Sequence, residues 1–303
     1  MAGLKELRTR IESIKSTYKI TSAMKMVSAS KFRRAQLTLE KSESFQKMLI
    51  EQITRIIAEI KMQEQEKHVT FILPKMLIQP EDPKRYILYV LGSDKGLCGS
   101  YNSMVAKEAK RRIDELKSKG KEVVVLCYGK KAYAGLKRLG FTDIAEQHFN
   151  VIKKHLTYLE AMEFLRAVWD KKVQYKADVC EIVYSDFLSG LTRTYLSKQV
   201  IPIDLPFSDE NSQLNQINGA FYGFVPDPMT VLRQYVSIYT RTAMFEILIN
   251  SQASEHAARM SSMDNATRNA QDMIQSLTFK YNSLRQSAIT TELVEIVAGA
   301  EAM

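Results

Sequence analysis

The sequence predicts an α/β protein in which a long antiparallel coiled coil, formed by the two ends of the chain, carries an inserted α/β domain. Neither glycine nor proline occurs from residue 4 to 73 or from residue 229 to 298, and these are the two residues that break helices. In both stretches apolar residues recur at alternating spacings of three and four, which is the pattern of a coiled-coil seam. All seven prolines and ten of the twelve glycines lie between the two stretches, where short apolar runs alternate with helical patterns.

The N-terminal segment, residues 1–73, is predicted to form one helix. A helix of 70 residues would be about 100 Å long, which is more than the width of a compact domain. Helices of an ordinary bundle rarely run much past about 25 residues without caps, so a bundle is disfavoured. We expect the seam to slip through Ile20, Met24 and Val27. On either side of the slip the predicted seam residues are Leu4, Leu7, Ile11, Ile14 and Tyr18, and then Phe45, Leu49, Ile53, Ile56 and Ile60.

The middle of the chain, residues 74–226, is predicted to form a Rossmann-like α/β domain. Strands that alternate with helices imply a parallel sheet covered by helices. The last two strands are joined at residues 188–190, which predicts a hairpin at the end of the sheet. The expected strands are 85–91, 121–128, 178–187 and 191–203, and the expected helices are 102–119, 130–139 and 156–173.

The C-terminal segment, residues 227–303, is predicted to form the second long helix. Asp227 supplies a capping carboxylate, and Pro228 suits the first helical position. The predicted seam residues are Met260, Met263, Thr267, Ala270, Ile274, Leu277, Tyr281, Leu284 and Ala288. We expect this seam to pair with that of the N-terminal helix.

Composition excludes several classes of protein. Hydrophobic residues make up 45% and charged residues 25% of the chain, which is typical of a folded protein. No apolar run reaches the length of a membrane-spanning helix, and the N-terminus lacks the apolar region of a secretory signal, so we expect neither. The three cysteines predict neither a disulfide framework nor a metal site.

Positive charge is concentrated near the N-terminus. The net charge is +9, and residues 1–34 hold nine basic and two acidic residues. Such a stripe favours an acidic partner surface. The stripe lacks the aromatic residues on which nucleic-acid bases stack, and it lacks the broad apolar face of a membrane-surface helix. The sequence therefore favours an acidic protein partner.

The chain shows no recognisable catalytic site. Its one glycine-rich loop, Gly92–Ser100, lies between a predicted strand and a predicted helix, where a phosphate-binding loop would lie. It matches neither the dinucleotide pattern nor the Walker A pattern, so a structural turn is favoured. Cys98 has no identifiable base, and the four histidines have no metal-ligand spacing. We therefore expect no catalytic residue, no cofactor and no metal.

Four segments resemble a known family. They are residues 20–31 (ITSAMKMVSASK), 93–99 (SDKGLCG), 254–266 (SEHAARMSSMDNA) and 281–297 (YNSLRQSAITTELVEIV). These segments resemble the gamma subunits of F-type ATP synthases and follow one another in the family's order. The resemblance therefore covers essentially the whole chain, with highly specific terminal motifs and a looser middle.

The resemblance implies a rotor shaft that couples ion flow through a membrane ring of c subunits to ATP synthesis and hydrolysis. The implied partners are the alpha and beta subunits of the catalytic ring, the epsilon subunit and the c-ring, with no nucleic acid and no direct membrane insertion. The implied beta-subunit contacts are Met24, Lys25, Arg259, Arg285 and Gln286. The implied foot, which faces the c-ring and epsilon, contains Tyr222, Phe224 and Val225.

The resemblance also implies a place in the cell, which is the cytoplasmic face of a bacterial plasma membrane, or the matrix side of the mitochondrial membrane for a processed organellar chain. Two other functions stay open on the residues alone. One is a nucleotide-binding α/β enzyme that uses the Gly92–Ser100 loop and dimerises through coiled-coil arms. The other is a basic coiled-coil protein that binds nucleic acid.

Overall fold

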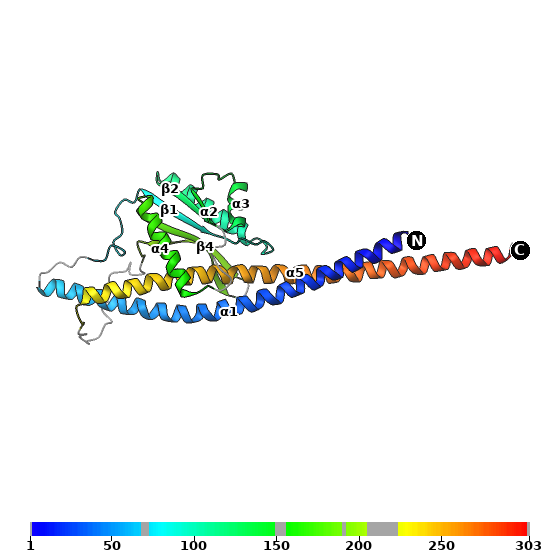
Figure 1. Cartoon of the computed structure of the whole chain (residues 1–303), viewed down its shortest axis with the longest axis horizontal. Helices are drawn as coiled ribbons and strands as arrows, with labels where there is room; N and C mark the ends of the chain where they lie inside the picture. The colour runs from blue at the N-terminus through cyan, green and yellow to red at the C-terminus, as the bar shows by residue number, and fades with distance from the viewer. Residues whose placement is uncertain (1, 68–72, 149–155, 190–191, 205–223, 302–303) are drawn as a thin grey trace.

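The computed structural model describes residues 2–67, 73–148, 156–189, 192–204 and 224–301. Two long helices, α1 (Ala2–Lys67) and α5 (Pro228–Glu301), run side by side in opposite directions, and an α/β domain lies against one half of their length (Figure 1). We call this helical pair the stem. The N-terminal end of α1 and the C-terminal end of α5 project beyond the domain. The predicted α/β class, with a long helix at the C-terminus, is confirmed.

The α/β domain is built on one mixed sheet of five strands in the order β3-β2-β1-β4-β5. Its strands are β1 (Arg85–Leu91), β2 (Glu122–Tyr128), β3 (Glu146–His148), β4 (Val179–Ser189) and β5 (Thr192–Ile201). The first four are parallel, and β5 pairs antiparallel to β4. The turn predicted between β4 and β5 falls partly on residues 190–191, which lie outside the described residues. Strand β3 was not predicted, because three polar residues carry no alternating apolar pattern.

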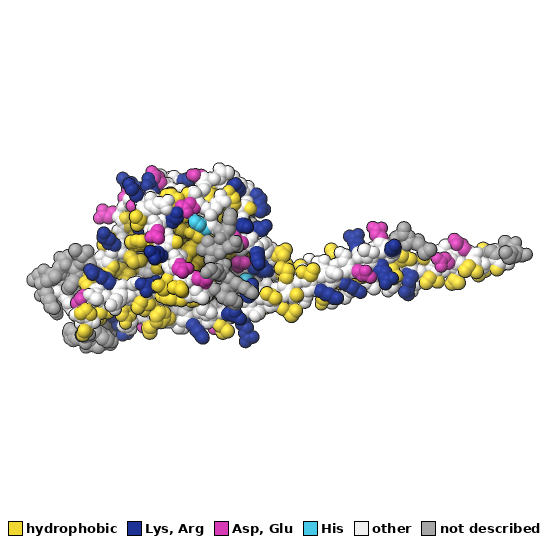
Figure 2. Space-filling view, in the orientation of Figure 1, with side chains coloured by type: hydrophobic (Ala, Val, Ile, Leu, Met, Phe, Trp, Pro, Cys, Tyr) yellow, Lys and Arg dark blue, Asp and Glu magenta, His cyan; other side chains and the backbone are white. Residues whose placement is uncertain are grey.

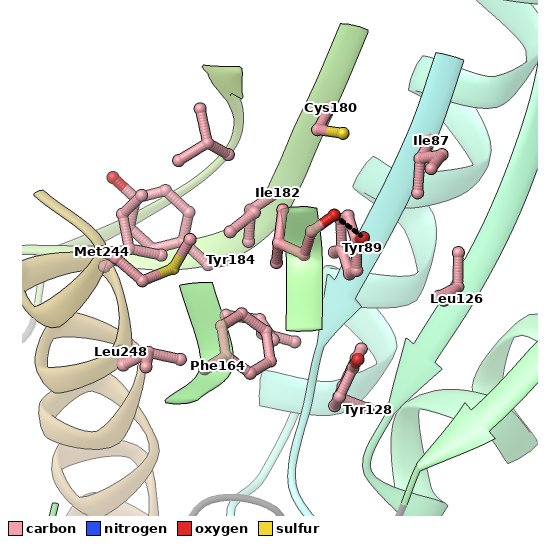
Figure 3. Packing of buried hydrophobic residues seen from close by; sticks show 14 of the residues in the cluster. Ile87, Tyr89, Leu126, Tyr128, Phe164, Cys180, Ile182, Tyr184, Met244 and Leu248 are labelled. Carbon is pink, nitrogen blue, oxygen red and sulfur yellow. Dashed lines mark hydrogen bonds between the residues drawn. The ribbon is translucent and has the colours of Figure 1, made fainter. Parts of the chain in front are cut away.

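Helices cover both faces of the sheet. One face lies under α2 (Tyr101–Ser118) and α3 (Lys130–Arg138), and the other lies under α4 (Tyr158–Gln174) and the middle of α5. Figure 3 shows Met244 of α5 beside Tyr184, and Leu248 of α5 on the side of Phe164 of α4, in one core. The stem is therefore part of the core of the domain.

The two stem helices meet in an antiparallel register that several contacts define. Thr267 Oγ1 donates a hydrogen bond to Thr21 Oγ1 at 2.9 Å. Farther along the pair, Leu39 of α1 lies in one apolar cluster with Ile249 and Ala253 of α5. The cluster beyond it joins Leu49, Ile53, Ile56 and Ile60 of α1 to Met229, Leu232, Val236, Tyr239 and Ala243 of α5. Apolar burial is thus deepest where the stem passes the α/β domain.

The slip predicted in the α1 seam is wrong. Ile20 and Val27 are 60% and 57% exposed, and Phe45 is exposed as well. Buried positions continue at spacings of three, four or seven through small and polar side chains, which a search for apolar periodicity does not detect. The buried residues at these spacings are Thr21, Ser28, Ala35, Leu39, Ser42, Gln46, Leu49, Ile53, Ile56 and Ile60, and Ile11 and Ala58 are buried as well. On α5, the predicted seam residues from Met260 to Ala288 are buried or half-buried except for the exposed Leu284.

Candidate protein-binding surface of the stem

The projecting part of the stem carries an exposed mixture of apolar and basic side chains (Figure 2). From residue 271 to 298, every side chain of α5 is exposed or half-buried. Apolar residues that are exposed on this part of α5 are Met273, Phe279, Leu284, Ile289, Leu293, Val294, Ile296 and Val297. Extended exposed apolar surface is typical of a protein-interaction site. We call residues 271–301 of α5 the α5 tip.

A second exposed apolar group lies on α1, opposite the part of α5 that directly precedes the α5 tip, as the Thr21–Thr267 and Lys25–Asp264 contacts show. Ile20, Met26 and Val27 point away from the buried seam, and they lie among the basic residues of the N-terminal stripe. Ile20 and Val27, from which the sequence predicted a slip of the seam, instead form part of an outward surface. Small residues such as Ser28 and Ala35 fill the interior between the helices.

Two of the predicted contact residues, Met24 and Lys25, lie half-buried on this part of α1. The Lys25 ammonium forms an ion pair with Asp264 of α5, with 2.5 Å between Nζ and Oδ1. Arg268 contacts the second oxygen of the same carboxylate. The hydrogen bond from Lys25 is the main reason that the pKa of Asp264 lies below its ordinary value. Lys25 therefore has an acidic partner within the chain.

Arg285 and Gln286 are both exposed on the α5 tip. The structure thus places both side chains where a surrounding protein can reach them. Arg259, the third residue of α5 that the resemblance implies as a beta-subunit contact, lies elsewhere on this helix and is only 8% exposed. Its guanidinium pairs with Glu255 at 2.6 Å and donates to the carbonyl oxygens of Lys95 and Gly96 at 3.3–3.4 Å.

Arg259 also shapes the environment of His256, one turn earlier. Arg259 Nη1 lies 3.4 Å from His256 Nδ1. Burial, helped by the positive charges of Arg259 and Lys31, lowers the pKa of His256 to about 4. At neutral pH the imidazole is therefore uncharged, and its Nδ1 can accept a hydrogen bond from the guanidinium.

The predicted foot residues lie at the other end of the stem. Val225 is 90% exposed, and Phe224 is half-buried against the cluster that joins α1 to the start of α5. Tyr222 lies outside the described residues. Asp227 caps α5 as predicted, because its carboxylate accepts a hydrogen bond from the Thr230 amide at 2.9 Å.

The Gly92–Ser100 loop lies where doubly wound α/β folds often bind ligands, at the carboxyl end of β1 beside β4. Here α5 crosses this edge of the sheet. Ser254 donates to the Ser185 carbonyl at 3.1 Å, and Asn250 accepts from the Phe187 amide at 2.7 Å. Cys98 is buried, and burial raises the pKa of its thiol. The chain's own helix thus occupies the crevice that a dinucleotide would use, which disfavours the enzyme alternative.

Among the described residues, no cluster of three or more His, Cys, Asp or Glu side chains is placed to hold a metal ion. No described helix combines the length and apolarity that crossing a membrane requires.

Comparisons with known proteins agree with this geometry. The family model described as ATP synthase matches residues 3–303. The ATP synthase gamma chain of Pelagibacter ubique (strain HTCC1062) is 36% identical over 303 residues, and that of Paramagnetospirillum magneticum (strain ATCC 700264 / AMB-1) is 38% identical over 306 residues, each covering 100% of both chains.

Solved structures show the same fold. A chain from the central stalk and c-ring of the Tetrahymena thermophila mitochondrial ATP synthase is 25% identical, with a TM-score of 0.53 over 82% of this chain and 99% of that chain. A chain of the Euglena gracilis mitochondrial ATP synthase is 17% identical, with a TM-score of 0.62 over 100% of this chain and 95% of that chain. On the full-length match to the family model and to these relatives, the chain belongs to the family of ATP synthase gamma chains.

Proposed function

We propose that this chain is the central rotor shaft of an F-type ATP synthase, coupling ion flow through a membrane c-ring to ATP synthesis or hydrolysis on surrounding alpha and beta subunits. The observation that carries the proposal is the α5 tip, which extends past the α/β domain with its side chains exposed. A helix so placed fits inside a ring of other subunits. The basic stripe on α1 suits an acidic segment of that ring.

The shaft is an antiparallel coiled coil. The buried positions of α1 and the Thr21–Thr267 contact support this arrangement. The whole chain divides into three units, which are the N-terminal helix at residues 1–73, the α/β domain at 74–226 and the C-terminal helix at 227–303. Because small residues such as Ser28 and Ala35 fill much of the seam, the two helices can approach closely and form a slender rod.

Beta subunits contact the shaft at Met24 and Lys25 and at Arg285 and Gln286. Arg259 supports the shaft from within the chain. It holds the Gly92–Ser100 loop against α5, since its donors reach two carbonyl groups of that loop. The foot at Tyr222, Phe224 and Val225 faces the c-ring and epsilon, and the exposure of Val225 supports this orientation.

The chain holds no catalytic site, cofactor or metal of its own, and catalysis belongs to the beta subunits. The complex places the chain at the periphery of a membrane, on the cytoplasmic face in a bacterium. Coverage of the Gly92–Ser100 crevice by α5 supports a structural role for this loop.

The proposal is tested by affinity purification of the tagged chain from native membranes. We expect alpha, beta, epsilon and c subunits in the eluate. A matched variant that ends at residue 270 lacks only the exposed α5 tip, so it should retain epsilon and c while it loses most alpha and beta. Absence of alpha and beta from the eluate of the full chain would show that the proposal is wrong.

A further inference from the structure

A pocket opens in the α/β domain on the side of the Gly92–Ser100 loop that faces α2 and α3. Its volume is about 380 Å³, and its walls include residues 96–99 of the loop, Asn102 and Lys107 of α2, and Lys131 and Arg138 of α3. Pockets that bind small molecules usually lie within about 300–1,000 Å³. The pocket is distinct from the crevice that α5 covers, and the shaft proposal assigns it no role.

Three cations surround this pocket without a counter-charge. Lys107, Lys131 and Arg138 all line it, and no Asp or Glu does. Within the described part of the chain, none of the three side chains forms an ion pair or a hydrogen bond. Lys131 reaches across the loop, because a Cβ placed on Gly96 would lie 3.7 Å from its Cε. Cations that converge without acidic partners favour a multivalent anion.

The loop itself is held so that it can add backbone donors. Asn102 Oδ1 accepts from the Ser93 amide at 2.9 Å, and Arg259 binds the carbonyl oxygens of Lys95 and Gly96 from the α5 side. A trans peptide directs its amide opposite to its carbonyl, so the amides of Gly96 and Leu97 point away from Arg259. Neither amide has an acceptor among the described residues. Free loop amides of this kind can bind phosphate oxygens.

The remaining wall is apolar. Leu97 is exposed, Leu139 is half-buried, and Cys98 lies buried behind them. An inorganic ion alone would leave this wall uncovered, whereas an organic group attached to the phosphate would cover it. We propose that this pocket binds a small phosphorylated organic molecule, with its phosphates at Lys107, Lys131 and Arg138 and its organic part against Leu97 and Leu139. The concave shape favours such a ligand over an acidic protein segment, which would need an open groove.

The proposal is tested by calorimetric titration of the purified full chain with inorganic pyrophosphate, ADP and adenosine. We expect pyrophosphate and ADP to bind, ADP more tightly, and adenosine not to bind, because it lacks phosphate. Lys131→Gln and Arg138→Gln should each weaken ADP binding by about 10- to 100-fold, which is the range for one lost charge-assisted hydrogen bond.

The matched control is Lys137→Gln. Lys137 lies beside Arg138 on α3, but its ammonium lies 4.7 Å from the ring centroid of Tyr133, and it does not line the pocket. The control should bind ADP as the unmodified chain does, with unchanged circular dichroism for all variants. Three outcomes would overturn the proposal: no binding of pyrophosphate or ADP at millimolar concentration, an equal loss in the control, or binding of poly-glutamate without binding of ADP. The last would identify the pocket as a dock for an acidic protein.

Discussion

Lys25 of α1 and Asp264 of α5 form an ion pair that ties the two stem helices together, with 2.5 Å between Nζ and Oδ1. The pair lies close to the Thr21–Thr267 hydrogen bond, so two polar contacts define the helix register at this point. Lys25 is also one of the proposed beta-subunit contacts. A residue of this kind can help to hold the shaft together and still present a partly exposed ammonium to the surroundings.

Replacing Asp264 with Asn should lower the melting temperature of the full chain slightly. The ion pair is lost, but both side chains are partly exposed, and exposed pairs contribute little. The pKa of Asp264 is lowered in the folded chain, so the stabilisation is present above its ordinary pKa of 3.8 and is lost as pH falls through the lower folded value.

Melting curves at low salt and at 1 M salt measure the contribution of the ion pair, since salt should reduce the difference in melting temperature between the variant and the unmodified chain. Asp272→Asn, an exposed control on α5, should change little. An equal shift in both variants would contradict the prediction.

The corrected α1 seam predicts a contrast between neighbouring residues. Ser28 is 4% exposed and Val27 is 57% exposed. Ser28→Leu forces a larger side chain into the close contact between the helices and should lower the free energy of unfolding by about 1–3 kcal/mol. Val27→Leu adds volume toward the solvent and should change it by less than about 0.5 kcal/mol. Urea unfolding of both variants measures the difference. A larger effect at Val27 would show that Val27 is buried between the helices, as the predicted slip of the seam requires.

These two residues show what the sequence could and could not predict about the stem. The absence of Gly and Pro over 70 residues at each end was sufficient to predict two long helices. The face of α1 that is buried could not be read from apolar spacing. Ser28 and Ala35 are small enough for α5 to approach, whereas Ile20 and Val27 are exposed on either side of Met24 and Lys25, which the shaft proposal assigns to beta-subunit contacts. Single-chain hydropathy cannot distinguish an intramolecular seam from an intermolecular surface.

The buried His256 predicts a loss of stability in mild acid. Its pKa is lowered to about 4, so the unfolded chain binds more protons between about pH 6.5 and pH 4. The stabilisation from the uncharged imidazole is complete above pH 6.5 and is lost as pH falls toward 4. Between pH 7 and pH 5 this amounts to roughly 2 kcal/mol of unfolding free energy. His256→Gln, which keeps an acceptor for Arg259, should remove that part of the pH dependence.

Urea unfolding at pH 7 and pH 5 provides the measurement for His256. His148→Gln serves as the control, because His148 is stacked on Tyr128 at the edge of the sheet and lies away from Arg259. The control should retain the fall in stability between the two pH values. A fall of the same size in His256→Gln would show that another group is responsible.

Glu246 predicts the opposite pH dependence. Its side chain extends from α5 and is influenced by the charges of Asp186 on β4 and Lys198 on β5. Its Oε2 is buried and has no hydrogen-bond partner among the described residues. Burial, together with the negative charges of Glu43 and Asp186, raises its pKa, although Lys198 opposes this. The folded chain therefore favours the protonated form, and stability falls as pH rises from the ordinary value of 4.5 through the raised folded pKa.

Glu246→Gln imitates the protonated side chain, so it should raise the free energy of unfolding at pH 7.5 and have little effect at pH 4. Thermal unfolding at the two pH values tests this. Glu292→Gln, an exposed control on the α5 tip, should have no such effect. A loss of stability at pH 7.5 would mean that the charged carboxylate is favourably paired.

The candidate contact residues could be predicted only in part, for a physical reason that Arg259 illustrates. Family resemblance placed it with Arg285 and Gln286, and all three lie on α5. Exposure separates them, because Arg259 faces the Gly92–Ser100 loop of its own chain whereas the other two lie on the α5 tip. No local sequence signal reports which helical arginine meets a loop 163 residues away. The basic pocket was missed for the same reason, since Lys107 and Arg138 become neighbours only when α2 and α3 pack on the sheet.

Arg285 and Gln286 provide the most direct test of the shaft. Replacing both with Ala should leave the helicity and melting temperature of the full chain unchanged, because both side chains are exposed and Ala favours helix. In the assembled ATPase the same change should slow ATP turnover and weaken retention of the catalytic ring. Arg offers a planar set of donors that suits a carboxylate, and Gln adds a donor and an acceptor. Each charge-assisted bond lost from a shielded contact is worth about 1.5–3 kcal/mol, or roughly tenfold or more in the equilibrium.

The matched control for this pair is Lys280→Ala with Asn282→Ala. It also removes one cation and one amide from exposed positions of the α5 tip, one turn earlier. If the effect comes from general loss of charge or polarity, the two double variants will behave alike. If a beta subunit binds Arg285 and Gln286 specifically, only their replacement will reduce turnover per assembled complex, measured as ATPase rate against beta content. Normal rate and stoichiometry in the Arg285/Gln286 variant would place the contact elsewhere on the shaft, and the exposed apolar residues Leu293 and Ile296 would then be the next to replace.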